Sequence, residues 1–401
     1  MLALLLISTL TLAFDIQPVK SDWTWTETIY IRADGSYEPD TAPISTVDNI
    51  TYTLTDNIVG DIPEGSSAIV VERDNIVVDG AGYTFQGGGT GINLTDRSNI
   101  TIKNTEIKEF YRGIFLYSSS NISISGNNIT NNYYCISLHS SSNHNNIFGN
   151  YIANNEYGIY LRRSSNNTIC LNNITANMVF GIYLLEDCDY TTICGNNIAN
   201  NHYGIHLTSS SYNIIYGNVI TDRNHHGIDL FVSSNNNSIF GNNIKNNTYG
   251  VHIHSSSDNN IYHNNFIDNT YQAHTVTSGY ANSWDNGYPS GGNYWSDHNP
   301  PDIYGGPYQN ETGRDKIGDI PYVIDGNNTD RYPLIYPYGY VPSPDFNGDG
   351  TVNILDAIRL ASVFGSKPGD PYWNPIIDIN QDGRVNILEA IIIAIHFGET
   401  V

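Results

Sequence analysis

Hydrophobic and polar positions repeat every 22 to 24 residues along the middle of the chain, from Tyr83 to Phe266. Each repeat contains a block in which two isoleucines flank an asparagine, as in Ile124 to Ile129. A second block has the form Gly-Ile-x-Leu, as in Gly158 to Leu161. Apolar and polar residues alternate within both blocks, which is β-strand spacing, and the Ser and Asn clusters between repeats are typical of turns.

A repeat of this length cannot bury its own apolar residues, so the repeats are expected to stack on one another. The pattern therefore predicts an all-β fold, a parallel β-helix solenoid of about nine rungs. Stacking in register also places one asparagine of each repeat in a single column. We interpret this column as an internal ladder, because a buried amide needs hydrogen-bond partners above and below. Its members are Asn127, Asn150, Asn172, Asn196, Asn218, Asn242 and Asn264.

Composition divides the rest of the chain into further segments. An apolar run from Met1 to Phe14 is too short to span a bilayer and resembles the core of a secretory signal peptide, which we place at residues 1–21. We expect first turns and a cap at 22–74, repeats at 75–266, a C-terminal cap at 267–334 and a Pro-rich linker at 335–344. We expect a secreted or cell-surface monomer with no membrane insertion after signal cleavage.

Charge narrows the range of partners. The 401-residue chain has a formal net charge of −23, and no basic stripe occurs in it. Such a surface repels phosphate backbones and anionic membranes, so we exclude nucleic acid as a partner. The four cysteines are too few for a disulfide scaffold. Cys170 and Cys194 share a repeat position on successive rungs, which favours plain packing, with a bridge as the alternative.

Two loops near the C-terminus have the ligand pattern of calcium-binding loops: hard oxygen ligands, with a glycine at the sharp turn. They span Asp345 to Asp356 and Asp378 to Glu389, and apolar helical stretches follow at Ala357 to Phe364 and Ala390 to Phe397. The expected ligands are Asp345, Asn347, Asp349, Thr351, Asn353, Asp356, Asp378, Asn380, Asp382, Arg384, Asn386 and Glu389. Thr351 and Arg384 would bind through their backbone carbonyls. Residues 345–398 resemble a type I dockerin, a small α-helical module, which implies two calcium ions and a cohesin-domain partner.

The segment that closes the repeats carries a second resemblance. Gly291 to Asp297, Gly318 to Tyr322 and Asp330 to Leu334 are similar to the end of the NosD-like β-helix family. That resemblance covers roughly residues 60–335. It implies a right-handed helix and copper binding, and the family overlaps a class of carbohydrate-binding and sugar-hydrolysing β-helices.

The x position of Gly-Ile-x-Leu points away from the core and gives a candidate site. Read along the stack, the row contains Tyr160, Tyr183, His206, Asp229 and His252, with His254 two residues further along the last strand. The aromatic half favours contact with sugar rings, and the His/Asp half suits a copper or zinc ion or polar contacts. A solvated polar face is the third interpretation.

The sequence favours a protein that binds polysaccharide or surface glycan and docks through its calcium module. Two alternatives remain open: a polysaccharide lyase, glycoside hydrolase or epimerase, and a copper-handling protein of the NosD type. No catalytic residue can be assigned.

Overall fold

The computed structural model describes residues 25–276, 280–339, 344, 346, 350–367, 370–372, 374, 377, 379 and 384–399. The chain divides into two compact units, Met1–Tyr338 and Gly339–Val401, which are treated separately below. The signal-peptide prediction lies outside the described residues, as do six expected calcium ligands, namely Asp345, Asn347, Asp349, Asp378, Asn380 and Asp382. Within the described part, no helix is long and apolar enough to cross a membrane.

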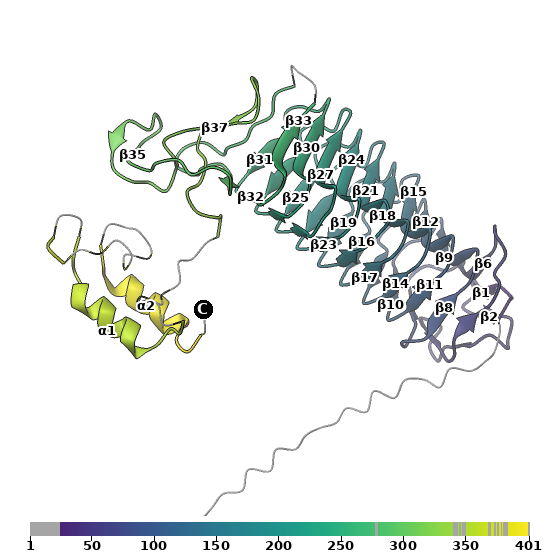
Figure 1. The fold of residues 1–401 in the computed structure, drawn as a ribbon. Coiled ribbons are helices and arrows are strands. Elements are labelled where there is room, and N and C mark those ends of the chain that lie inside the picture. The colour runs from purple at the N-terminus through teal and green to yellow at the C-terminus, as the bar shows by residue number, and fades with distance from the viewer. Residues whose placement is uncertain are drawn as a thin grey trace, which may run out of the picture. The chain divides into compact units, whose positions relative to one another are not determined.

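The first unit is a parallel β-helix, as the repeat pattern predicts. Three sheets of 12, 11 and 11 strands run along its length, and each turn of the chain contributes one strand to each sheet (Figure 1). The stack extends beyond the expected repeats, because β1 and β4 already join the sheets before residue 75 and β33 and β34 join them after Phe266.

Sheet A contains the Gly-Ile-x-Leu blocks, and we define it by its strands in chain order. These are β1 (Ile29–Ile31), β2 (Tyr37–Glu38), β6 (Ser67–Val71), β9 (Thr90–Thr95), β12 (Arg112–Tyr117), β15 (Tyr134–His139), β18 (Tyr157–Arg162), β21 (Phe180–Leu185), β24 (Tyr203–Thr208), β27 (His226–Phe231), β30 (Tyr249–His254) and β33 (Tyr271–Thr275).

Sheets B and C contain the two halves of the asparagine blocks. Sheet B consists of β3 (Ile44–Ser45), β4 (Thr51–Leu54), β7 (Ile76–Asp79), β10 (Ile100–Lys103), β13 (Ser123–Ser125), β16 (Asn146–Phe148), β19 (Thr168–Cys170), β22 (Thr192–Cys194), β25 (Ile214–Tyr216), β28 (Ser238–Phe240) and β31 (Asn260–Tyr262). Sheet C consists of β5 (Ile58–Val59), β8 (Thr84–Gln86), β11 (Glu106–Lys108), β14 (Asn128–Thr130), β17 (Tyr151–Ala153), β20 (Asn173–Thr175), β23 (Asn197–Ala199), β26 (Val219–Thr221), β29 (Asn243–Lys245), β32 (Asn265–Ile267) and β34 (Tyr294–Trp295).

The core is a set of isoleucine and leucine columns, one for each inward strand position. Ile159, Ile182 and Ile205 pair directly across β18, β21 and β24, and all three are fully buried. Because each residue packs on an identical residue one rung away, the period of the sequence becomes a continuous apolar interior.

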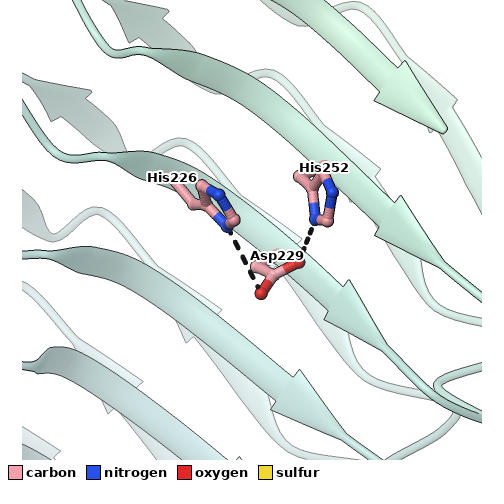
Figure 2. Close-up of side chains that lie close together, drawn as sticks. All are labelled: His226, Asp229 and His252. Carbon is pink, nitrogen blue, oxygen red and sulfur yellow. Dashed lines mark hydrogen bonds and ion pairs between the residues drawn. The ribbon is translucent and has the colours of Figure 1, made fainter. Parts of the chain in front are cut away.

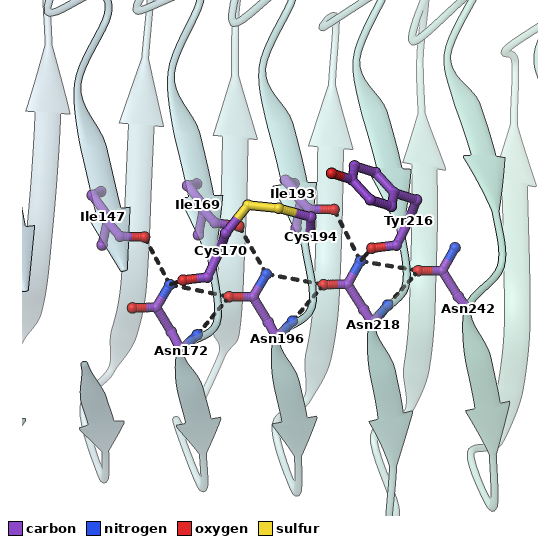
Figure 3. The surroundings of a disulfide bond; sticks show 10 residues. All are labelled: Ile147, Ile169, Cys170, Asn172, Ile193, Cys194, Asn196, Tyr216, Asn218 and Asn242. Atoms are coloured by element: carbon purple, nitrogen blue, oxygen red, sulfur yellow. Dashed lines mark hydrogen bonds between the residues drawn. A yellow bond between two sulfur atoms is a disulfide. The ribbon is translucent and has the colours of Figure 1, made fainter. Parts of the chain in front are cut away.

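The asparagine ladder has the form that the sequence predicts. The Nδ2 of Asn172 donates to the Oδ1 of Asn196 at 3.0 Å, and the Nδ2 of Asn196 donates to the Oδ1 of Asn218 at 2.9 Å (Figure 3). Sequence analysis found only this ladder. A second runs at the turn from sheet C to sheet A, and a third, interrupted at Thr191, runs at the turn from sheet A to sheet B. The second comprises Asn132, Asn155, Asn177, Asn201, Asn224, Asn247 and Asn269.

Cys170 and Cys194 form a disulfide, so the expectation of plain packing is wrong (Figure 3). They are register partners on β19 and β22, with Cα atoms 4.6 Å apart, which lies within the range that a disulfide spans. Strand stacking alone therefore supplies the geometry for the bridge.

The closing segment contributes the last acceptor of the asparagine ladder. Asn264 donates to the Oδ1 of Asn293 at 3.0 Å, and the backbone N–H of Asn293 donates to the Oδ2 of Asp330 at 2.7 Å. The indole N–H of Trp295 donates to the same oxygen at 2.9 Å. A Cβ at Gly292 would lie 1.9 Å from the Oδ1 of Asp330, so glycine is required there. Two hairpins, β35 (Tyr304–Gly305) with β36 (Glu311–Thr312) and β37 (Tyr322–Val323) with β38 (Thr329–Asp330), complete this segment.

The second unit contains two helices, α1 (Ile354–Val363) and α2 (Ile387–Ile395). Both start three residues earlier than the apolar pattern indicates, because each begins with a capping box. Asn353 and Asp356 form the first box, and Asn386 and Glu389 form the second. A small core that includes Leu360 and Ile393 packs beneath them.

Candidate functional site

The outward row of sheet A is in register on successive strands. Tyr160 pairs with Tyr183, Tyr183 with His206, His206 with Asp229, and Asp229 with His252. The row is less exposed than a free surface would be, because side chains of neighbouring columns cover it. Asp229, for example, is only 2% exposed.

Asp229 on β27 is the centre of a histidine cluster. Its Oδ2 lies 2.7 Å from the Nδ1 of His206, and its Oδ1 lies 2.7 Å from the Nδ1 of His252. The Nε2 of His206 lies 2.9 Å from the Oγ1 of Thr208, so both nitrogens of that ring are engaged. His206 is thus placed to hold the carboxylate of Asp229 in position.

A third histidine that sequence reasoning missed, His226, completes the cluster (Figure 2). Its Nδ1 is 3.4 Å from the Oδ2 of Asp229 and is buried, with no hydrogen-bond partner among the described residues. One ligand atom each from His226, Asp229 and His252 can be chosen so that all lie within 4.8 Å of one another. His226 is the first residue of β27, where the register partners are Tyr203 and Tyr249. Tracing that column as well as the x column would have found it.

The electrostatics of the cluster favour the charged form of the Asp229 carboxylate. Burial alone would raise the pKa of Asp229, but the imidazoles of His206, His226 and His252 outweigh it and hold this pKa well below its usual range. Burial and neighbouring histidines lower the pKa of His225 and of His274. Those two flanking imidazoles are therefore neutral near pH 7.

His254 occupies a separate place on the same sheet. It lies in the column beyond His252, where its ring stacks on Phe231 with centroids 4.9 Å apart. Its Nδ1 is buried and has no hydrogen-bond partner in the part of the chain that the structure describes, but the group around Asp229 does not include it.

The aromatic half of the row contacts other rings. The ring of Tyr160 stacks on Tyr134 at 5.3 Å, and the ring of Tyr183 stacks on Phe180 at 4.3 Å. Burial raises the pKa of both tyrosine hydroxyls in the row. A ring face that already packs on a neighbour is not free for a sugar, which weakens the case for stacking at these two residues.

The described calcium-loop residues include two buried carboxylates. Asp356 and Glu389, at the last position of each loop, are fully buried. The Oε1 of Glu389 has no hydrogen-bond partner among the residues that the structure describes, as expected of an oxygen that a cation would bind. That both loops bind calcium stays a prediction.

Comparison with known families gives two matches. The model of the family described as periplasmic copper-binding protein (NosD) matches residues 27–203 and 181–300. The model of the dockerin type I domain matches residues 343–396. No curated protein matches the chain.

Solved structures with a similar fold are distant in sequence. The Dettilon tailspike protein is 16% identical, with a TM-score of 0.48 over 65% of this chain and 57% of that chain. The A-module of the Azotobacter vinelandii mannuronan C-5 epimerase is 14% identical, with a TM-score of 0.44 over 60% and 80% of the two chains. A periplasmic alginate epimerase is 17% identical, with a TM-score of 0.46 over 60% of this chain and 78% of that chain.

Proposed function

The chain belongs to the family of periplasmic copper-binding proteins (NosD), and on that premise we propose that its β-helix binds a transition-metal ion through His226, Asp229 and His252. The observation that carries the proposal is the meeting of two imidazoles and a buried carboxylate on two adjacent strands. Imidazole suits copper and zinc, and the Nδ1 of His226 has no hydrogen-bond partner in the described part of the chain.

The chain's own residues prepare such a site. His206 fixes the carboxylate of Asp229 through the 2.7 Å contact, as outer partners of metal ligands do. The Nδ1 of His252 faces the Oδ1 of Asp229 at 2.7 Å, and this ring would bind the ion through the nitrogen that its tautomer leaves without a proton. A bound cation would also balance a carboxylate charge that is costly to bury. The ion itself would supply Lewis-acid or redox chemistry, or be cargo.

The second unit suggests where this site is used. We propose that the dockerin-type module binds two calcium ions and docks to a cohesin-domain partner, outside the cytoplasm. The buried carboxylates of Asp356 and Glu389 support the calcium part of this proposal.

Glycan binding is the second candidate function. It is favoured by three partly exposed tyrosines beside the outer face of sheet A, namely Tyr111 (38%), Tyr117 (43%) and Tyr133 (42%). Tyr111 and Tyr133 stack on each other with ring centroids 5.2 Å apart, so the face of each that is turned to the other is not available to a sugar. Exposed aromatic side chains are well suited to contact the apolar faces of sugar rings. Catalysis on such a glycan, by a lyase, hydrolase or epimerase, stays a prediction with no residues assigned.

The metal proposal is tested by titrating copper and zinc into the full chain with calcium present. His226→Ala, Asp229→Asn and His252→Ala should each lower affinity for the ion by at least about tenfold. His144→Ala, in an exposed turn, is the matched control and should change nothing. If a variant that carries all three substitutions is folded and binds copper and zinc as the parent does, the proposal fails.

A further inference from the structure

A second group of unsatisfied side chains lies nearer the N-terminal end of sheet A, on β12 and β15. Three buried polar atoms there have no hydrogen-bond partner among the described residues: the Nε of Arg112, the Oγ of Ser137 and the Nε2 of His139. All three surround Phe115. The Cζ of Arg112 is 4.7 Å from the centroid of that ring, the ring of His139 is 5.4 Å away, and Ser137 is its register partner.

Arg112 brings a positive charge to this group. It forms no ion pair with any described carboxylate, as is also true of other basic residues of the chain such as Arg73 and Arg223. Nearby Arg162 and Arg163, by contrast, share the carboxylate of Glu186. The guanidinium of Arg112 instead packs over the rings of Tyr111 and Phe115, with its Cζ 5.1 and 4.7 Å from their centroids, so no described acid competes with an anionic ligand for its charge.

The two neighbours of Arg112 act as neutral hydrogen-bonding groups. Burial, with the positive charges of Arg112 and Arg162, lowers the pKa of His139 to about 4, so the imidazole is neutral near pH 7. Ser137 is fully buried, and its hydroxyl has no hydrogen-bond partner within the described ranges. Each of these orphaned groups costs free energy unless something bonds to it.

We propose that Arg112, Ser137 and His139 form a subsite for the carboxylate of an acidic sugar. The fork of a guanidinium matches a carboxylate, and the hydroxyl and imidazole supply further hydrogen bonds. The exposed ring of Tyr111 lies 5.1 Å from the Cζ of Arg112, and that of Tyr117 lies 6.4 Å from the ring of Phe115, so both flank the subsite, where they would contact the sugar itself. That this carboxylate belongs to a sugar rests on glycan binding, the second candidate function proposed above.

The subsite is separate from the histidine cluster. Three strand spacings lie between β15 and β24, which corresponds to about 14 Å along the solenoid.

The test measures binding of oligogalacturonate and oligomannuronate to the full chain, with the methyl ester of each oligomer as its uncharged counterpart. The parent should bind at least one acid and bind its ester at least tenfold more weakly, because the ester cannot accept a charge-assisted pair of hydrogen bonds. Arg112→Gln should weaken the acid by about 10- to 100-fold. Arg163→Gln removes the same charge from a paired, exposed position and is the matched control.

A further variant separates a binding role from a structural one. Ser137→Ala deletes a buried hydroxyl that lacks a partner, so thermal stability should be unchanged or higher while affinity for the acid falls. Equal binding of acid and ester, or unchanged affinity in Arg112→Gln, would reject the subsite while leaving glycan binding intact. Failure to bind any of the acids or esters would reject both.

Discussion

Replacing Asn196 by alanine tests the asparagine ladder at its middle. The side chain is 1% exposed and makes four hydrogen bonds. Its Oδ1 accepts from the backbone N–H of Asn172 at 3.0 Å, and its Nδ2 donates to the carbonyl of Ile169 at 2.8 Å. In the alanine variant, the backbone N–H of Asn172 and the carbonyl of Ile169 each lose this hydrogen-bond partner within the buried core. Each buried group left unpaired costs about 1–3 kcal/mol, so Asn196→Ala should lower the free energy of unfolding by about 2–6 kcal/mol.

The adjacent residue gives the control for that experiment. Asn197 is exposed on the outer face of β23, so Asn197→Ala should change the unfolding free energy by less than about 0.5 kcal/mol. Urea unfolding of both variants, followed by circular dichroism, measures the difference. Metal and glycan binding should be the same in both. If the two variants unfold at the same urea concentration, the ladder does not stabilise the fold and our reasoning about buried amides is wrong.

Two other predictions concern the closing segment and the calcium module. Burial raises the pKa of the Asp330 carboxyl to about 7, above its value of about 4 in the unfolded chain. The folded state is therefore favoured most when this carboxyl is protonated. Its contribution to stability is full below about pH 4 and is lost as the pH rises through about 7. Asp330→Asn should remove that part of the pH dependence in thermal melts at pH 4 to 8, and an unchanged profile would contradict the assignment. Replacing Asp345 and Asp378 together by alanine should abolish calcium binding by residues 345–398, and calorimetry that still shows two calcium ions per chain would refute the loop assignment.

The repeat made most of the fold predictable. Because every rung places Asn196 and its equivalents in the same environment, one period of the sequence describes many rungs, and strand register follows. Register alone also brought His206, Asp229 and His252 together. The period did not predict the role of His226, because this residue lies outside the columns that were traced. It also could not predict a hydrogen-bond partner that lies outside the repeats. Asp330 is such a partner, since it completes the ladder from 37 residues beyond Asn293.

Burial on the outer face was also not predictable from the pattern. Alternation shows that a side chain points away from the core, but it does not show whether neighbouring rings cover it. The rings of Tyr160 and Tyr183 pack on Tyr134 and Phe180, which lie at a strand position that the Gly-Ile-x-Leu pattern does not include. Arg112 was missed for the same reason. It immediately precedes the glycine of its block and so lies at a strand position that the Gly-Ile-x-Leu pattern does not include.

The central claim is that the histidine cluster on sheet A holds a transition-metal ion. Its most direct test is diffraction from crystals of the full chain grown with copper, with data collected on both sides of the copper absorption edge. We predict an anomalous peak in contact with His226, Asp229 and His252, and no such peak in crystals of the His226→Ala variant. Copper found only at other side chains, with none at Asp229, would contradict the account.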